Sequence, residues 1–419
     1  MKKREFLKNI TMAGLSIPFA SFAFGDKTQQ GKFNINSSGS GEDYWETIRQ
    51  QYQLQSDYIN LENGYYSMMA MPVLSAYIEH VNKINREASF YMRTRMLTDK
   101  LEVRQLLAIF LDCPHEELII TRNTTESMDT IICGIDWKSG DEAIMAQQDY
   151  GSMLDMFKQQ ARRYGIKNNV LSIPNHPKSD EDIVDLYRTA ITPKTKLIMI
   201  CHMINITGQI LPVKKICDMA HEHGVKVLVD GAHAIAHLDF KIRDLNCDYY
   251  ASSLHKWLGM PLGAGLLYVK KEHISGLWPL FGDSSYADDD IRKLNHAGTQ
   301  PMFTELCMRN AIDFHQGIGS KRKEERLRFL QTYWTAQVRH IPGITINTPE
   351  TPARACGIAN VGIDKLKPAD MAKTLMDKYR IWAVAIDNAN VKGCRITPHV
   401  YTTTKELDTL VRALKEMNI

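Results

Sequence analysis

The stretch LIMICHMINITGQILPVKKICDMAHEHGVKVLVD, residues 197–230, decides the fold class. It opens with an unbroken apolar run over residues 197–201, which predicts a buried strand. An amphipathic helix is predicted over residues 213–223, with Gly224 as its stop signal. A second apolar run then leads into Asp230. This strand–helix–strand order predicts an α/β fold with a largely parallel sheet sandwiched by helices.

The pattern along the chain predicts more than one domain, as its 419 residues also suggest. Helical patterns and short β-rich runs alternate up to about residue 317, which predicts a large domain over residues 76–318. Residues 319–419 are predicted to form a smaller α+β domain, with residues 44–75 packing against it. Within the small domain we expect a charged helix, two strands and an amphipathic terminal helix, over residues 321–338, 354–363, 381–386 and 404–417.

Residues 1–25 are predicted to be an export signal. A basic head, KKR, precedes an apolar run that is interrupted by Pro18 and is too short for a comfortable membrane span. Small residues permit cleavage near Gly25. The string KREFLK, residues 3–8, resembles a twin-arginine signal with lysine in place of the first arginine. The expected location is therefore the periplasm or beyond, and the alternative is a cytoplasmic protein with an amphipathic N-terminal helix.

Residues 26–43 are rich in Ser, Gly, Asn, Gln and Lys, which predicts a flexible linker. The net charge is +3, from 51 basic and 48 acidic residues, and there is no long basic run, so nothing indicates nucleic-acid binding. Eight cysteines include no C-x-x-C pair, and no metal site is predicted. A disulfide stays open if the protein is exported.

Polar residues follow three of the predicted strands. Asp230 ends one strand, Asn205 comes shortly after another, and Lys256 follows a third. Ligands of open α/β sheets bind beyond the carboxyl ends of the strands, so we expect these side chains to meet at one edge. From spacing alone, an Asp230–Lys256 salt bridge is the alternative to a catalytic site.

The motif SSLHKWLG, residues 252–259, together with DGAH at residues 230–233, resembles the class V aminotransferases of pyridoxal-phosphate (PLP) fold type I. That family includes cysteine desulfurases, kynureninases and isopenicillin-N epimerases, and the resemblance extends over residues 58–419. It implies PLP as the cofactor and Lys256 as the lysine that holds it as a Schiff base.

The resemblance also implies roles around the PLP ring. Asp230 would keep the ring nitrogen protonated, while His233 and Asn205 would face the ring phenolate. Tyr150 stands where the family stacks a histidine or aromatic ring on PLP. Arg395 stands where the family binds the substrate carboxylate with a bidentate guanidinium.

For the phosphate, Thr124 and Thr125 stand at a predicted helix start, where backbone N–H groups make an anion site. A plain helix N-cap is the alternative for these threonines. Ser253 and His255 match phosphate positions of the family. Thr299, in HAGT at residues 296–299, matches a loop that reaches the phosphate of a neighbouring subunit, which implies a homodimer with a shared active site.

The reaction is narrowed by one absence in the sequence. In the cysteine desulfurases of this family, the cysteine that attacks the substrate sulfur lies on a loop before the carboxylate-binding arginine. The corresponding residues 379–393 contain no cysteine, so the resemblance does not favour persulfide chemistry. YINLENGY, residues 58–65, is most similar to the isopenicillin-N epimerase branch. We therefore expect an enzyme acting on an amino acid through an external aldimine, by transamination or epimerisation, with Lys256 as general base. A Cβ-eliminating lyase of C–S lyase type and a PLP-holding binding protein without turnover are the alternatives.

Overall fold

The computed structural model describes residues 41–419. The predicted export signal and nearly all of the predicted linker lie outside these residues. The linker was expected to reach residue 43, but helix α2 (Glu42–Arg49) begins two residues earlier. Its apolar side chains Trp45 and Ile48 are buried in the main core, and burial of that face explains why the helix forms there.

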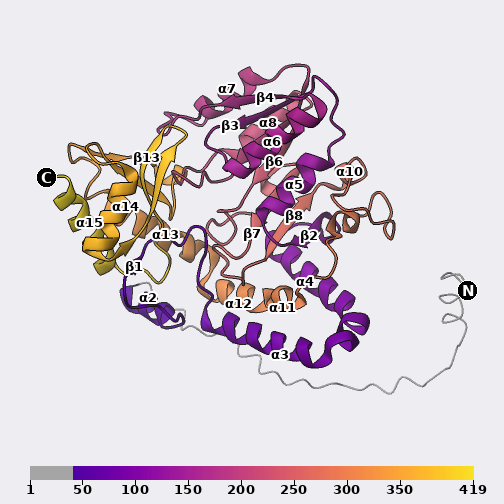
Figure 1. Ribbon diagram of the computed structural model, residues 1–419, viewed down its shortest axis with the longest axis horizontal. Coiled ribbons are helices and arrows are strands. Elements are labelled where there is room, and N and C mark those ends of the chain that lie inside the picture. Colours follow the sequence, from indigo (N-terminus) through magenta and orange to yellow (C-terminus); the bar gives the residue numbers. More distant parts are fainter. Residues whose placement is uncertain (1–40) are drawn as a thin grey trace, which may run out of the picture. The chain divides into compact units, whose positions relative to one another are not determined.

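The central sheet confirms the predicted α/β fold (Figure 1). Its seven strands follow the order β2 (Leu118–Thr121), β8 (Gly265–Val269), β7 (Tyr249–Ser253), β6 (Lys226–Asp230), β5 (Thr195–Cys201), β3 (Glu142–Ala146) and β4 (Lys167–Leu171). Neighbouring strands are parallel except that β8 runs antiparallel to β2 and β7. The carboxyl ends of β2, β3, β5, β6 and β7 therefore lie at one edge of the sheet.

Helices cover both faces of this sheet. In β5, Ile198 and Ile200 belong to one apolar cluster, whereas Leu197 and Met199 belong to another, as the two-residue period of a strand requires. The first cluster includes residues of α4 (Met96–Leu111), α7 (Glu181–Ala190) and α8 (Val213–Glu222). The second includes residues of α5 (Thr124–Gly134) and α6 (Gly151–Tyr164). Three more helices pack on one another beside the sheet: α3 (Met71–Thr94), α11 (Met302–Leu306) and α12 (Met308–Ile318).

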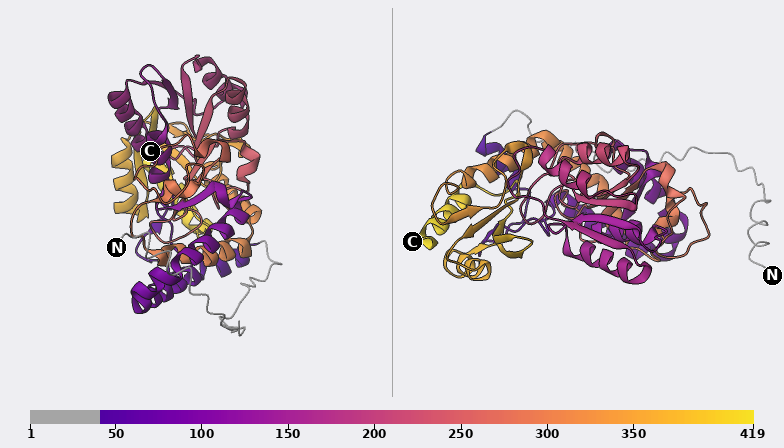
Figure 2. Two further views of the ribbon diagram at one scale, coloured as in Figure 1. Left: turned by 90° about the vertical axis from the view of Figure 1, so that its right-hand side faces the viewer. Right: turned by 90° about the horizontal axis from the view of Figure 1, so that it is seen from above.

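The C-terminal domain, yellow in Figure 2, has its own antiparallel sheet and its own core. The strand order is β12 (Val384–Asn388), β13 (Val391–Ile396), β10 (Ala359–Ile363) and β9 (Ile344–Ile346). Its helices are α13 (Ser320–Thr335), α14 (Pro368–Tyr379) and α15 (Thr404–Met417). The smaller α+β domain and its terminal helix are thus as predicted, and a capping box of Thr403 and Glu406 starts α15.

Two predicted strands of this domain differ from the structure. The strand expected from residue 354 begins only at Ala359, because residues 352–354 form a 3₁₀ turn that starts with a proline and its fixed φ. The strand expected over residues 381–386 is split into β11 (Ile381–Trp382) and β12. β11 pairs in parallel with β1 (Ile59–Asn60), which joins the N-terminal segment to this domain.

All eight cysteines lie in the described part of the chain, and all are free thiols. Within residues 41–419, no helix combines the length and the apolar character that crossing a membrane requires. The same residues hold no group of three or more His, Cys, Asp or Glu side chains arranged to bind a metal ion.

Candidate active site

A cavity of about 230 Å³ lies where the carboxyl ends of the strands meet. Because these strands run the same way, the residues that follow them reach one edge of the sheet. Nine of the ten predicted cofactor residues line this cavity: Thr124, Thr125, Tyr150, Asn205, Asp230, His233, Ser253, His255 and Lys256. The structure thus brings nine of these residues together at one cavity.

Lys256 is held in this cavity as a buried amine. It follows β7, its residue is 9% exposed, and its Nζ lies 3.2 Å from Nε2 of His233. Burial lowers the pKa of Lys256 to about 8, against the opposing effect of the Asp230 charge. The structure shows no ion pair between Lys256 and Asp230, so it does not support the salt-bridge alternative. An amine with this pKa is partly unprotonated near neutral pH, as a nucleophile or base requires.

Asp230 ends β6 as a buried carboxylate, and its Oδ1 accepts a hydrogen bond of 2.9 Å from the backbone N–H of Ala232. Burial raises its pKa above the ordinary value, so the ionised form needs a cationic partner. Gly231 is required at the next position, because a Cβ there would lie 2.1 Å from the ring of Tyr250. A protonated ring nitrogen of PLP would be such a cationic partner for Asp230.

At another wall of the cavity, the N-terminus of α5 supplies donors. The N-cap is Asn123, whose side chain accepts from the backbone of Glu126, so the threonines are not caps. The Thr124 backbone N–H donates to Ser253 Oγ at 2.9 Å, and the two hydroxyl oxygens lie 2.7 Å apart. A helix N-terminus with adjacent hydroxyls suits a phosphate.

The residues present fit PLP. Its phosphate matches the donors at α5, its ring nitrogen matches Asp230, and its aldehyde matches the amine of Lys256. Among the described residues, Oδ1 of Asn205 is buried without a hydrogen-bond partner. A buried polar atom left unused indicates that a further polar group belongs in this cavity.

Arg395, predicted to bind the substrate carboxylate, does not line the cavity, and its guanidinium group already makes hydrogen bonds within the chain. The residue is 0% exposed. Its Nε and Nη2 donate to the carboxylate of Glu62 at 3.1 and 2.6 Å, and Tyr65 covers the guanidinium at 4.4 Å. Its Nη1 donates to the carbonyl of Asn205 at 3.2 Å. In this conformation Arg395 cannot also hold a substrate carboxylate bidentately, because Glu62 already fills that geometry.

Thr299 also lies away from the cavity that holds Lys256. It is exposed and lines a separate, larger cavity of about 1030 Å³ together with His296, Gly298 and Gln300. Within one chain, therefore, the structure does not bring Thr299 to the other cofactor residues.

Sequence reasoning missed several residues at this site, and three of them lie in one segment of the chain. Tyr65 and Tyr66 line the cavity, and Glu62 neutralises Arg395. All three lie in residues 58–65 or directly after them, far in sequence from the strands of the central sheet. The rule that ligands bind beyond the carboxyl ends of these strands could therefore not place them. The signal that could have found Glu62 is that it is the single acidic residue of residues 58–65, within a segment predicted to pack on the domain that carries Arg395.

Comparisons with known proteins identify the family of this chain. The model of the aminotransferase class-V family matches residues 41–410. An isopenicillin N epimerase from Amycolatopsis lactamdurans is 28% identical over 397 residues, covering 89% of this chain and 98% of that protein. A probable cysteine desulfurase from Halalkalibacterium halodurans is 27% identical over 386 residues, covering 86% and 93%.

Solved structures share the fold. The apo structure of a cysteine desulfurase from Thermococcus onnurineus NA1 matches with a TM-score of 0.79 at 22% identity, covering 89% of this chain and 97% of that one. A C-DES variant with glycine covalently linked to its PLP cofactor matches with a TM-score of 0.80 at 21% identity, covering 87% and 98%. This protein therefore belongs to the class-V aminotransferase family and is a PLP-dependent enzyme.

Proposed function

We propose that the protein acts on an amino acid at its Cα, by transamination or epimerisation. The observation that carries the proposal is the buried, readily neutral amine of Lys256 in a cavity whose walls fit PLP. PLP, when bound, supplies an electron sink for the charge left at Cα. Lys256 then takes the proton from Cα as general base and returns it. Asp230 holds the proton at the ring nitrogen, and Tyr150 and His233 orient the ring.

Persulfide chemistry is disfavoured by the state of two thiols, one that lines the cavity and one that precedes Arg395 in the sequence. Cys201 lines the cavity, but burial raises its pKa well above 9.0, and nearby Asp149 and Asp230 raise it further. Cys394 is fully buried in β13, and burial raises its pKa as well. A thiol must ionise to act as a nucleophile, so neither cysteine suits attack on a substrate sulfur.

The test is a screen of the PLP-loaded protein against L- and D-amino acids in deuterium oxide. We expect deuterium to enter at Cα of at least one amino acid. Keto-acid release then indicates transamination, and inversion on a chiral column indicates epimerisation. Release of cysteine persulfide and pyruvate from cystine would instead indicate the Cβ-eliminating lyase. Absence of both Cα exchange and product with every amino acid would leave a PLP-holding protein without turnover.

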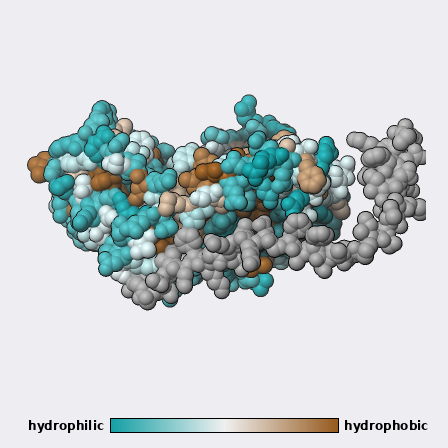
Figure 3. All heavy atoms as spheres, turned by 90° about the horizontal axis from the view of Figure 1, so that it is seen from below, coloured by the Kyte–Doolittle hydropathy of each residue, from teal (hydrophilic) through white to brown (hydrophobic). Residues whose placement is uncertain are grey.

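We further propose a homodimer in which Thr299 of one subunit serves the phosphate of the other. The proposal is supported by the exposed Thr299 and by the large cavity around it, whose wall includes Leu97, a residue 69% exposed. On the face drawn in Figure 3, hydrophobic residues occur in small groups among hydrophilic ones.

Mixing two inactive variants tests the shared site. In a homodimer, a Lys256→Ala subunit can supply Thr299 to the intact Lys256 of a Thr299→Ala subunit. Mixed and reassembled variants should therefore recover PLP affinity and activity in part of the dimers. Sedimentation as a monomer, or no recovery on mixing, would contradict the proposal.

For location, we propose export of the folded protein, with the predicted signal removed near Gly25. The support is the sequence of residues 1–25. Cell fractionation with N-terminal sequencing tests it. An uncleaved protein in the cytoplasm would favour the cytoplasmic alternative, and cleaved protein in a strain without the twin-arginine translocase would contradict only the route.

A further inference from the structure

We infer that Trp257 is a positioning residue that decides which nitrogen of His233 carries the proton, and that it thereby favours the neutral amine of Lys256. The inference deepens the proposed function, on which its catalytic consequence rests. Its structural part concerns only residues of this chain. It begins from the fact that the residue directly after the PLP-binding lysine points its indole N–H at the histidine beside that lysine.

The tautomer of His233 follows from hydrogen-bond chemistry. Nε1 of Trp257 lies 3.3 Å from Nδ1 of His233, and an indole N–H can only donate. Nδ1 must therefore be the acceptor. Burial, aided by neighbouring positive charge, lowers the pKa of His233 well below 6.5, so the ring is neutral and carries one proton. That proton is left on Nε2.

The consequence reaches Lys256, whose Nζ lies 3.2 Å from Nε2 of His233. If Lys256 is protonated, the N–H at Nε2 of His233 and the ammonium group are both hydrogen-bond donors, so their contact is unfavourable. The same N–H donates well to the lone pair of a neutral amine. The contact between His233 and Lys256 is therefore satisfied only when the lysine has lost its proton. Other groups that act on this amine are Asp230, Arg395, Cys201 and Glu62.

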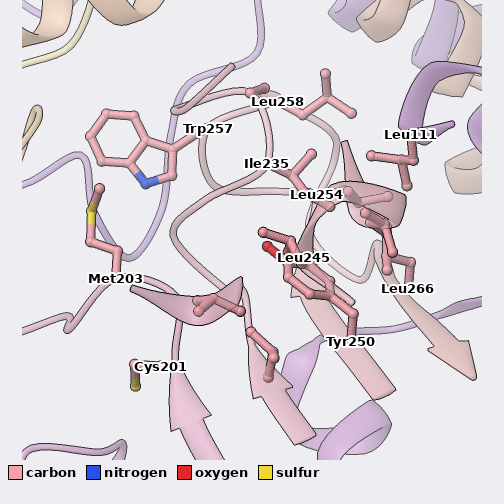
Figure 4. Close-up of a cluster of buried hydrophobic side chains, with 14 of the residues drawn as sticks. Leu111, Cys201, Met203, Ile235, Leu245, Tyr250, Leu254, Trp257, Leu258 and Leu266 are labelled. Atoms are coloured by element: carbon pink, nitrogen blue, oxygen red, sulfur yellow. The ribbon is translucent and has the colours of Figure 1, made fainter. Parts of the chain in front are cut away.

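Trp257 is fixed firmly enough for this role. It is 1% exposed and lies in the cluster of buried side chains drawn in Figure 4. Its ring packs against His237, with centroids 3.7 Å apart, and stacks on His399 at 5.6 Å. Its carbonyl accepts a hydrogen bond from Nζ of Lys323 on α13. Contacts to the ring and the backbone together leave the indole N–H one direction, toward His233.

The experiment compares Trp257→Phe with Trp334→Phe in the full-length chain before PLP is added. Phenylalanine keeps an aromatic ring between His237 and His399 but removes the N–H. Trp334 is the matched control, because it is also fully buried and its Nε1 has no hydrogen-bond partner among the described residues. Two quantities are measured: the tautomer of His233 by ¹⁵N NMR, and the pH midpoint for acetylation of Lys256, followed by mass spectrometry.

We expect the wild type and Trp334→Phe to hold the proton on Nε2 of His233, with a Lys256 midpoint near 8. In Trp257→Phe, the Nδ1–H form should appear and the midpoint should rise by about 1 on the pH scale, because His233 can then accept from an ammonium. A wild-type His233 protonated at Nδ1 would overturn the inference even if Trp257→Phe failed to fold. An unchanged midpoint in a folded Trp257→Phe would overturn it too.

These readouts are independent of turnover. If no amino acid reacts with the PLP-loaded enzyme, the proposed function fails while the tautomer and the midpoint still test the role of Trp257. If amino acids react but the midpoint does not move, only the role of Trp257 fails.

Discussion

Two buried cations flank the same tyrosine ring, and the protein treats them in opposite ways. Nζ of Lys256 lies 5.5 Å from the centroid of the Tyr65 ring, and Cζ of Arg395 lies 4.4 Å from it. Arg395 has a carboxylate of its own, Glu62, whereas no ion pair involves Lys256 in residues 41–419. A lysine can lose its proton when buried, but an arginine cannot, so burial forces a partner on Arg395 alone. The difference separates a reactive amine from a permanently charged group.

The largest effect is expected when Lys256, the reactive member of this pair, is replaced. Lys256→Ala should lower turnover by about 10⁴-fold, the upper range for loss of a positioned acid–base group. Borohydride reduction should attach PLP to the peptide that contains Lys256 in the wild type and leave the variant unlabelled. Lys323→Met is the matched control, because Lys323 is equally buried but does not line the cavity. PLP recovered on the Lys323 peptide would refute the assignment.

The second test removes the counter-charge of Arg395. Glu62→Gln leaves the Arg395 charge buried without a counter-charge, and we expect the free energy of unfolding to fall by about 3–5 kcal/mol. Asp377→Asn is the surface control, since Asp377 and Lys373 are both well exposed and such pairs contribute about 0–1 kcal/mol. Urea unfolding of both variants measures the difference. Equal, small losses would mean that solvent reaches Arg395.

A third test concerns Asp230, the carboxylate that raises the pKa of Lys256 without pairing with it. Both Asp230→Ala and Asp230→Asn should lower kcat by about 10²–10³, on the scale of losing one preorganised electrostatic group. PLP affinity should fall less than kcat, because the donors at α5 remain. Asparagine keeps the shape and can still accept from Ala232. Near-normal activity in Asp230→Asn would show that the charge is not needed.

The smallest expected effect is a change of the free energy of unfolding with pH, which a buried lysine produces and Arg395 does not. Burial lowers the pKa of Lys323 to about 7, against 10.5 for an ordinary lysine. Between these values the unfolded chain binds more protons, so this group makes stability rise with pH. Wild type should gain stability relative to Lys323→Met between pH 7 and pH 9.5 in urea unfolding. A difference that is constant across this range would contradict the lowered pKa.

Much of the site was predictable because it sits at strand ends. Asp230 ends β6, Lys256 and Thr124 follow β7 and β2, and the sheet itself was evident from apolar runs. The strand limits in the small domain were less predictable. A 3₁₀ turn that begins at Pro352 takes up the start of one predicted strand, and the other is divided at Ala383 into β11 and β12.

By itself, the sequence determined the fold class through its local periodicity, and short motifs that resemble a known family implied the position of the reactive lysine and the residues expected around PLP. Periodicity and short motifs depend on neighbours in the chain. Only the tertiary structure decided how Arg395 is neutralised and which nitrogen of His233 faces Lys256. Glu62 and Arg395 are distant in sequence, and the tautomer of His233 depends on a 3.3 Å contact with Trp257. Protonation states in a buried site depend on which groups folding brings into contact, and local sequence does not carry that information.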